Sequence, residues 1–252
     1  GKLSIAGYGR LTQDLSNGEG MQGRLYYLYA DYQGLYDKLD LRFGRQFVNY
    51  AAGSSLIDGA RVDLKNIGPV AFSVMGGRNV IYDLYNESTR GGDYVLGIAA
   101  SLYNMKNTDL ELSWYHKLEQ DDVAQDIIGL NFKQYFLNSM KLYGNLRYDV
   151  ASEVFSEFLA GASYFPLNNL ILTAEWYRSY PMFDATSIYS VFAVNRYQEG
   201  VFKADYRINK MFSVNAGYIR QDYDEGTSDV IEIGAGVRPN DTLRINLNSD
   251  FD

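Results

Sequence analysis

The segment "LDLRFGRQFV" at residues 39–48, followed by "LIDGARVDL" at 56–64, indicates the class of fold. Apolar and polar residues alternate in both segments, and Arg42 and Arg61 each stand between apolar neighbours. Because successive side chains of a β-strand point to opposite faces, the alternation predicts strands with one apolar face and one charged face. Strict alternation assigns Arg42 and Arg61 to the charged face and Arg45 to the apolar face, unless a bulge shifts the register.

The same alternation recurs along the whole chain, and no segment shows convincing helical periodicity. We expect fifteen strands, at about residues 2–11, 21–32, 38–48, 59–65, 70–78, 93–103, 108–117, 125–135, 140–149, 154–165, 169–179, 197–207, 211–220, 229–238 and 242–251. Short links such as 66–69 follow the even strands, and longer polar links such as 118–125 and 221–229 follow most of the odd ones. Short turns at one end, long loops at the other and strands of about ten residues are typical of outer-membrane β-barrels.

We therefore predict an all-β fold, a transmembrane antiparallel up-and-down β-barrel of about 16 strands, with 14 or 18 as alternatives. Its short turns would be periplasmic and its longer loops extracellular. Residues 1–252 would form a single barrel domain, and because bacterial barrels close with an even number of strands, we expect the last strand to lie outside the given chain. The expected location is the bacterial outer membrane, with its lipid and lipopolysaccharide as surroundings. A water-soluble sandwich would need no such regular difference in loop length.

The composition agrees with this class and excludes several others. Aromatic residues make up 15% of the chain, and tyrosine and tryptophan collect at both boundaries of a membrane. The chain has no cysteine, hence no thiolate metal site and no C-x-x-C-H haem attachment, and we expect no cofactor. The net charge of −8 argues against a nucleic-acid partner. No apolar run of about 18 residues is present, so the sequence predicts no transmembrane helix.

The charged face predicts a water-filled lumen, because so many charges cannot be buried dry without a severe desolvation cost. Any single charge can equally pair with an opposite charge on a neighbouring strand and stiffen the wall. The residues that we expect to line the pore are Arg42, Arg61, Asp63, Lys133, Lys141, Arg147, Lys203 and Arg207.

One part of the charged face carries small residues instead, which indicates that another segment lies against it. On the strands near 70–78 and 93–103, Ser73, Gly97 and Ala99 are among the residues that point to this face. The long link 80–92 is the segment that we expect to fold into the barrel and narrow it, selecting solutes by size and dipole. It would form a constriction loop with Asp83, Glu87 and Arg90. The alternative is an ordinary surface loop.

"GRQ" at 44–46 ends one strand, and "DGAR" at 58–61 opens the next after about ten residues. This pair resembles a pattern in porin-like outer-membrane channels of Gram-negative bacteria, among them specific porins, alginate-export channels and porin-like proteins of metal-reducing bacteria. The motif covers under a tenth of the chain. The resemblance implies passive diffusion of small hydrophilic solutes or ions through a porin without enzymatic activity. It also implies homo-oligomers, commonly trimers, and pore-lining roles for Arg42 and Arg61.

Other functions fit parts of the same pattern. The barrel could sheathe a multihaem cytochrome partner as an electron conduit, which co-purification of a haem-staining protein would reveal. It could be an outer-membrane enzyme that uses His116 with Asp121 or Asp122, although alternation places His116 outward beside Trp114. It could also be a receptor or adhesin with acidic, tyrosine-rich loops; the acidic stretch 222–226 lacks the spacing of an EF-hand. For a porin we expect weak selectivity in the lumen and a slight preference for cations at the mouth.

Overall fold

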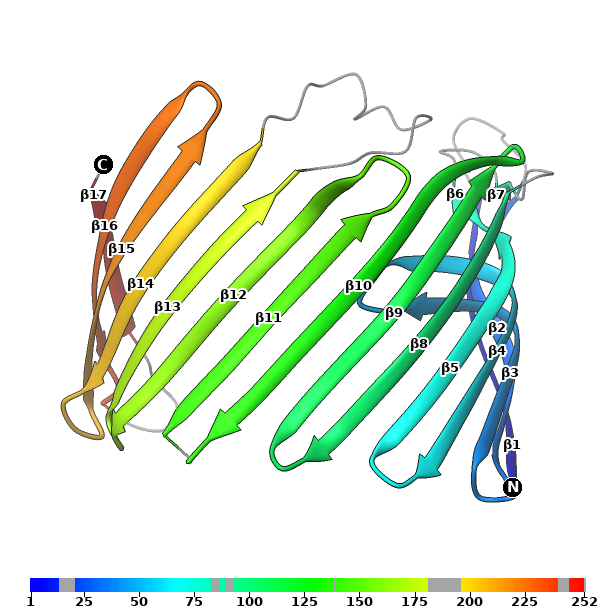
Figure 1. Ribbon diagram of the computed structural model, residues 1–252, viewed down its shortest axis with the longest axis horizontal. Helices are drawn as coiled ribbons and strands as arrows, with labels where there is room; N and C mark the ends of the chain where they lie inside the picture. Colours follow the sequence, from blue (N-terminus) through cyan, green and yellow to red (C-terminus); the bar gives the residue numbers. More distant parts are fainter. Residues whose placement is uncertain are drawn as a thin grey trace. The chain divides into compact units, whose positions relative to one another are not determined.

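β-Strands make up the regular structure of the residues that can be described. The computed structural model describes residues 1–13, 21–82, 87–88, 93–137, 139–180, 196–239 and 245–251 (Figure 1). Among these residues no helix is long and apolar enough to span a membrane.

Fifteen strands form one sheet in which each strand is hydrogen-bonded to its neighbours in chain order. They are β1 (Lys2–Thr12), β2 (Gln22–Leu35), β3 (Leu39–Asn49), β4 (Ser54–Ile67), β5 (Val70–Asn79), β8 (Tyr94–Met105), β9 (Thr108–Glu119), β10 (Asp122–Phe136), β11 (Met140–Asp149), β12 (Val154–Leu167), β13 (Leu170–Ser179), β14 (Tyr197–Arg207), β15 (Phe212–Tyr223), β16 (Gly226–Val237) and β17 (Ile245–Phe251). Two short strands, β6 (Ile81–Tyr82) and β7 (Glu87–Ser88), pair with each other in a separate sheet. The pairing is antiparallel and up-and-down, as the alternation predicts.

The strands lie close to the predicted positions, but several run further into the links. The links 118–125 and 221–229, which we expected to be loops, consist of strand extensions joined by two-residue turns at 120–121 and 224–225. At the first turn Gln120 and Asp121 have φ values of 54° and 69°, the left-handed conformation of tight hairpin turns. Strand β4 begins at Ser54 rather than near residue 59, so the β3–β4 link is a hairpin with a short tip. A strand end with polar residues on both faces has the same composition as a loop. This explains why the sequence predicted loops where the structure has strand extensions.

The described chain divides into two compact units. Unit 1 comprises Gly1–Met105, Leu110–Leu130 and Asp149–Glu153, and unit 2 comprises Lys106–Asp109, Asn131–Tyr148 and Val154–Asp252. Within each unit the sheet has an apolar face, on which aliphatic and aromatic side chains are exposed, and a polar face, which carries ion pairs. Exposed side chains of the apolar face include Phe43, Leu96 and Ile98 in unit 1, and Phe202, Ile231 and Ile233 in unit 2.

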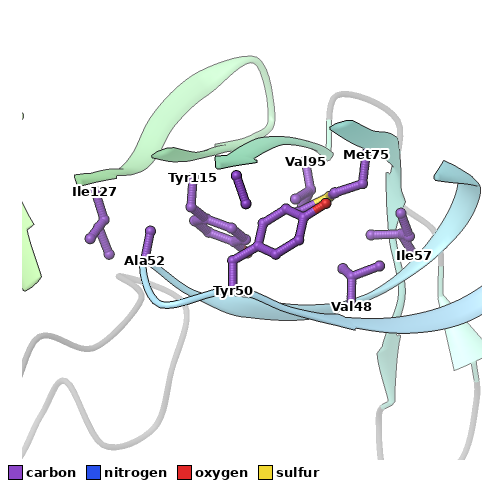
Figure 2. Packing of buried hydrophobic residues seen from close by; sticks show 9 residues of the cluster. Val48, Tyr50, Ala52, Ile57, Met75, Val95, Tyr115 and Ile127 are labelled. Atoms are coloured by element: carbon purple, nitrogen blue, oxygen red, sulfur yellow. The ribbon is translucent and has the colours of Figure 1, made fainter. Parts of the chain in front are cut away.

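The buried core of unit 1 lies on the polar face, where the end of the β3–β4 hairpin covers the sheet. We call residues 48–57 the hairpin tip. Its side chains pack against β5, β8, β9 and β10 in a cluster that Figure 2 shows: Val48, Tyr50, Ala52, Ile57, Met75, Val95, Ala99, Tyr115 and Ile127. Burial of these apolar groups is the main favourable contribution to holding the tip on the sheet.

A row of three glycines crosses the hairpin and its neighbour shortly before the tip. Gly44 on β3 is opposite Gly59 on β4, which is opposite Gly77 on β5. Gly44 has a φ of +120°, and a Cβ atom at Gly59 would lie 2.1 Å from the carbonyl oxygen of Gly76. Because strand glycines permit close backbone approach and sharp bends, we attribute the bend of the hairpin (Figure 1) to this row.

We expect Gly59→Ala to lower the free energy of unfolding by about 1–3 kcal/mol, because the added methyl group would overlap the backbone of β5. Gly200→Ala is the matched control, since a Cβ atom at this strand glycine meets nothing within 4 Å. Its effect should stay within about 0.5 kcal/mol. Urea unfolding of the refolded protein in detergent micelles would measure both, and equal losses of stability would contradict the assignment.

Candidate functional site

The hairpin tip is attached to the sheet by hydrogen bonds from its own backbone. The amide of Ala51 donates to Oε1 of Glu111 at 2.6 Å, and the amide of Ala52 donates to Oγ of Ser113 at 2.8 Å. Both acceptors belong to β9, 60 residues or more along the chain. A buried amide without a partner is costly, so these two side chains satisfy the donors that the turn leaves free.

Side chains complete the attachment. The Tyr50 hydroxyl is 2.5 Å from Oγ of Ser73, and the hydroxyls of Tyr115 and Ser55 are also hydrogen-bonded. The glycines of the wall provide the space: a Cβ atom at Gly97 would lie 2.9 Å from the Tyr50 ring, and one at Gly129 would lie 2.1 Å from the Ala52 nitrogen. The small residues of the wall therefore mark the area that the tip covers.

The patch of small residues near 70–78 and 93–103 is thus covered by the hairpin tip. The sequence pointed instead to the link 80–92, of which Val80 is buried. Asp83 and Arg90 lie outside the described residues, as does the side chain of Glu87, so a constriction by that link stays a prediction. One residue of the sequence could have indicated the tip. Val48 is apolar, although alternation from Arg42 assigns it to the polar face.

Six charged residues on β2, β3 and β4 form what we call the charged block, beside the hairpin tip on the polar face. They are Asp31, Asp40, Arg42, Arg61, Asp63 and Lys65. In the β3–β4 register Arg42 is directly opposite Arg61, and Asp40 is directly opposite Asp63. Each member of these like-charged couples has an opposite charge elsewhere: Arg42 pairs with Asp31 at 3.3 Å, Arg61 with Asp63 at 2.9 Å, and Lys65 with Asp40 at 2.5 Å. The block is neutral overall, and its arginine couple and its aspartate couple are two residues apart along β3 and β4.

Both arginines of the block remain partly exposed and lie over aromatic rings. The Arg42 guanidinium carbon is 4.3 Å from the centre of the Tyr29 ring, and that of Arg61 is 5.9 Å from the Tyr50 ring in the hairpin tip. Each ring adds a cation–π attraction to the ion pair. The contact between Arg61 and Tyr50 joins the charged block to the hairpin tip, so the two form one site.

The predicted pore-lining residues of unit 2 lie on its polar face, most of them paired with a neighbour. Lys133 pairs with Asp109 at 3.2 Å, Arg147 with Glu157 at 3.1 Å, and Lys203 with Glu232 at 2.9 Å. Lys141 lies 4.4 Å from the centre of the Tyr143 ring, and Arg207 is exposed at the end of β14.

The Lys203–Glu232 pair joins β14 to β16 across Gly217 of the strand between them. A Cβ atom at Gly217 would lie 3.1 Å from Oε2 of Glu232, so the missing side chain makes room for this pair. The pair therefore depends on a residue that carries no charge itself.

Arg45 lies on the apolar face, as strict alternation predicts. Its neighbours Phe43 and Phe47 are 54% and 62% exposed, and the pairing of Arg45 with Asp58 shows no shift of register. The guanidinium donates to both carboxylate oxygens of Asp58, at 2.7 and 2.8 Å, and to the carbonyl oxygen of Leu25 at 3.0 Å. This bidentate pair offsets the cost of placing an arginine among aromatic side chains.

His116 lies beside Trp114, as predicted, and the two rings are stacked with centres 5.5 Å apart. Its acidic neighbour is Asp126, whose Oδ1 atom is 3.7 Å from Nδ1 of His116, rather than Asp121 or Asp122. The same carboxylate accepts a hydrogen bond of 2.6 Å from the Trp114 indole. The arrangement is that of an aromatic pair with a shared polar neighbour.

Comparison with solved structures identifies the fold. OccK5 (OpdH) of Pseudomonas aeruginosa has a TM-score of 0.53 at 13% identity, with 99% of this chain and 82% of that chain covered. An engineered mutant of the Rh. blastica porin has a TM-score of 0.50 at 15% identity, with 99% and 94% covered. OccD3 (OpdP) of Pseudomonas aeruginosa has a TM-score of 0.50 at 12% identity, with 92% and 74% covered. No protein-family model and no curated protein matches the sequence. The chain has the up-and-down β-barrel fold of porins, as the sequence predicts.

We expect Ser113→Ala to accelerate hydrogen exchange at the Ala52 amide roughly tenfold. Leaving a buried amide without its acceptor destabilises the attached state of the tip by about 1–3 kcal/mol. Ser163→Ala is the control, because Ser163 is also a buried strand serine but belongs to unit 2. Exchange followed by mass spectrometry on peptides that contain residues 48–57 would measure the effect. Unchanged exchange in Ser113→Ala would contradict the attachment.

Proposed function

We propose that this chain is an outer-membrane porin, whose polar face lines a water-filled channel for passive diffusion of small hydrophilic solutes or ions. The observation that carries the proposal is the hairpin tip, which folds onto the charged face of a sheet whose opposite face exposes apolar side chains. A wall with lipid on one side and water on the other requires this division of residues.

The apolar face supports a location in the membrane. Continuous exposed apolar surface of this extent is unfavourable in water, and a lone Arg or Lys at the membrane midplane costs about 2–4 kcal/mol. Arg45, which lies on this face, is paired with Asp58 and hydrogen-bonded to the backbone. The distribution of charges is therefore the one that an outer-membrane protein needs.

The hairpin tip and the charged block support selection of solutes by size and dipole. The tip covers part of the polar face and would narrow the channel there. The arginine couple Arg42–Arg61 and the aspartate couple Asp40–Asp63 would create a local field beside it. Because the six charges of the block sum to zero, its preference between anions and cations should be weak. The tip would also obstruct a haem protein threaded through the barrel, which speaks against the role of a cytochrome sheath.

Planar-bilayer recordings test the proposal directly. The purified protein should produce stable ion conductance, and its reversal potential in a salt gradient should show weak selectivity. Arg61→Gln leaves Asp63 without its partner and should raise the cation-to-anion permeability ratio, whereas Asp63→Asn should lower it, each by roughly twofold to fivefold. Arg220→Gln, which removes an exposed charge from the apolar face, should leave the ratio unchanged. A protein that inserts without conductance would refute the channel.

Gly129→Val should raise the single-channel conductance. The new side chain would occupy the position of the Ala52 backbone and displace the tip, while the sequence of the tip itself stays unchanged. Gly200→Val, at a strand glycine with free space, is the control. Hydrogen exchange at residues 51–52 would confirm that the tip has been displaced. If exchange accelerates while conductance stays the same, the tip does not narrow the channel.

A further inference from the structure

We propose that Tyr177, Tyr197, Tyr223 and Glu199 form a binding site for small organic cations of the alkylammonium type on the polar face of unit 2. This inference names a class of solute and rests on the proposed channel function for its physiological meaning. The site itself is defined by contacts within β13, β14 and β15.

The three tyrosines form a row across adjacent strands. The centres of the Tyr177 and Tyr197 rings are 6.0 Å apart, and those of Tyr197 and Tyr223 are 5.2 Å apart. Tyr197 begins β14 and Tyr223 ends β15, so the row lies at the end of the strands that is nearest to the long link 180–196. The side chains are only partly buried, which leaves ring surface for a ligand.

Glu199 supplies a carboxylate in direct contact with this row. The Tyr197 hydroxyl donates to Oε2 of Glu199, and Nε2 of Gln221 donates to the same oxygen at 3.0 Å. These neutral donors orient the carboxylate without adding a positive charge. Glu157 and Glu232, on the same face, each have a cationic partner within 3.1 Å. Among the residues that the structure describes, Glu199 forms no ion pair with a lysine or arginine, and Arg196 lies against Gln198 instead.

Next to the tyrosine row, the polar face carries two aliphatic side chains on β14 and β15, beside Glu175 on β13. Val201 and Ile219 are opposite each other on β14 and β15, two residues from Glu199 and Gln221 respectively. Both are placed between the tyrosine row and the Lys203–Glu232 pair. Half-buried aliphatic groups at these positions gain nothing from contact with water or with inorganic ions.

Aromatic ring faces, a carboxylate held by neutral donors and aliphatic side chains together fit one class of ligand. The faces of tyrosine rings carry negative potential and attract cations, most strongly those that shed water easily. A quaternary or alkylammonium ion offers a diffuse positive charge with apolar substituents, which suits all three features. Hydrated Na⁺ or K⁺ would gain from the carboxylate alone, and an anion would be repelled.

The test measures binding of tetramethylammonium to the folded protein in detergent micelles, by isothermal titration or saturation-transfer NMR, with K⁺ as the competing ion at equal ionic strength. We expect saturable binding that Glu199→Gln abolishes and that Tyr177→Leu weakens roughly twofold to fivefold. Tyr197→Phe retains the ring and should keep most of the affinity, whereas Tyr197→Leu should not. Asp109→Asn is the control for charge, because it removes one carboxylate from the polar face of the same unit away from the tyrosines.

Conductance recordings on the same samples separate this inference from the proposed function. Tetramethylammonium should reduce the K⁺ current through the wild type and less so through Glu199→Gln. Binding without any conductance would leave the site in place and refute the channel. Conductance without saturable binding would overturn the site alone, and so would equal binding by a neutral sugar that requires the same tyrosines.

Discussion

A single-layer sheet offers its side chains two surfaces, and this constraint governs the rest of the structure. Every side chain of a strand lies on one of two surfaces, and the exact period of two leaves no position between them. Many of the charges are therefore neutralised by a partner within the same surface. The pairs Arg42–Asp31 and Lys65–Asp40 on the polar face follow this rule, as does Arg45–Asp58 on the apolar face.

The same constraint explains which features the sequence could predict. Alternation is local, so the strand positions and the two faces followed from residues close together in the chain. The side taken by Arg45 stayed open, because a bulge would have reversed it, and the register of β3 with β4 decides it. The hairpin tip did not, because its partners Glu111 and Ser113 are about 60 residues away and their pattern is that of an ordinary strand. Small residues such as Gly97 indicated that something covers the wall, but they carry no information about which segment does so. The prediction of a loop at 118–125 was wrong for a different reason. A strand end with polar residues on both faces has the same composition as a loop.

Contacts that skip a strand were also beyond the reach of sequence patterns. Lys203 reaches Glu232 across Gly217, and the Tyr143 hydroxyl donates to Glu175 across Gly161. In both cases the glycine between the partners supplies only free volume. Cross-strand pairing rules consider adjacent residues and therefore miss such pairs. Glycines such as Gly217 and Gly161 are informative for this reason, since they mark places where the flanking strands interact directly.

The attachment of the hairpin tip also imposes an order on assembly. The tip can dock only on a surface that β5, β8, β9 and β10 have already formed, because its amides at residues 51 and 52 find their acceptors on β9. Contacts between residues so distant in the chain form late, after the entropy of closing the intervening loop has been lost. Docking of the tip is then a late step, and the polar face of β5, β8, β9 and β10 would be uncovered for a brief stage before residues 48–57 pack on it.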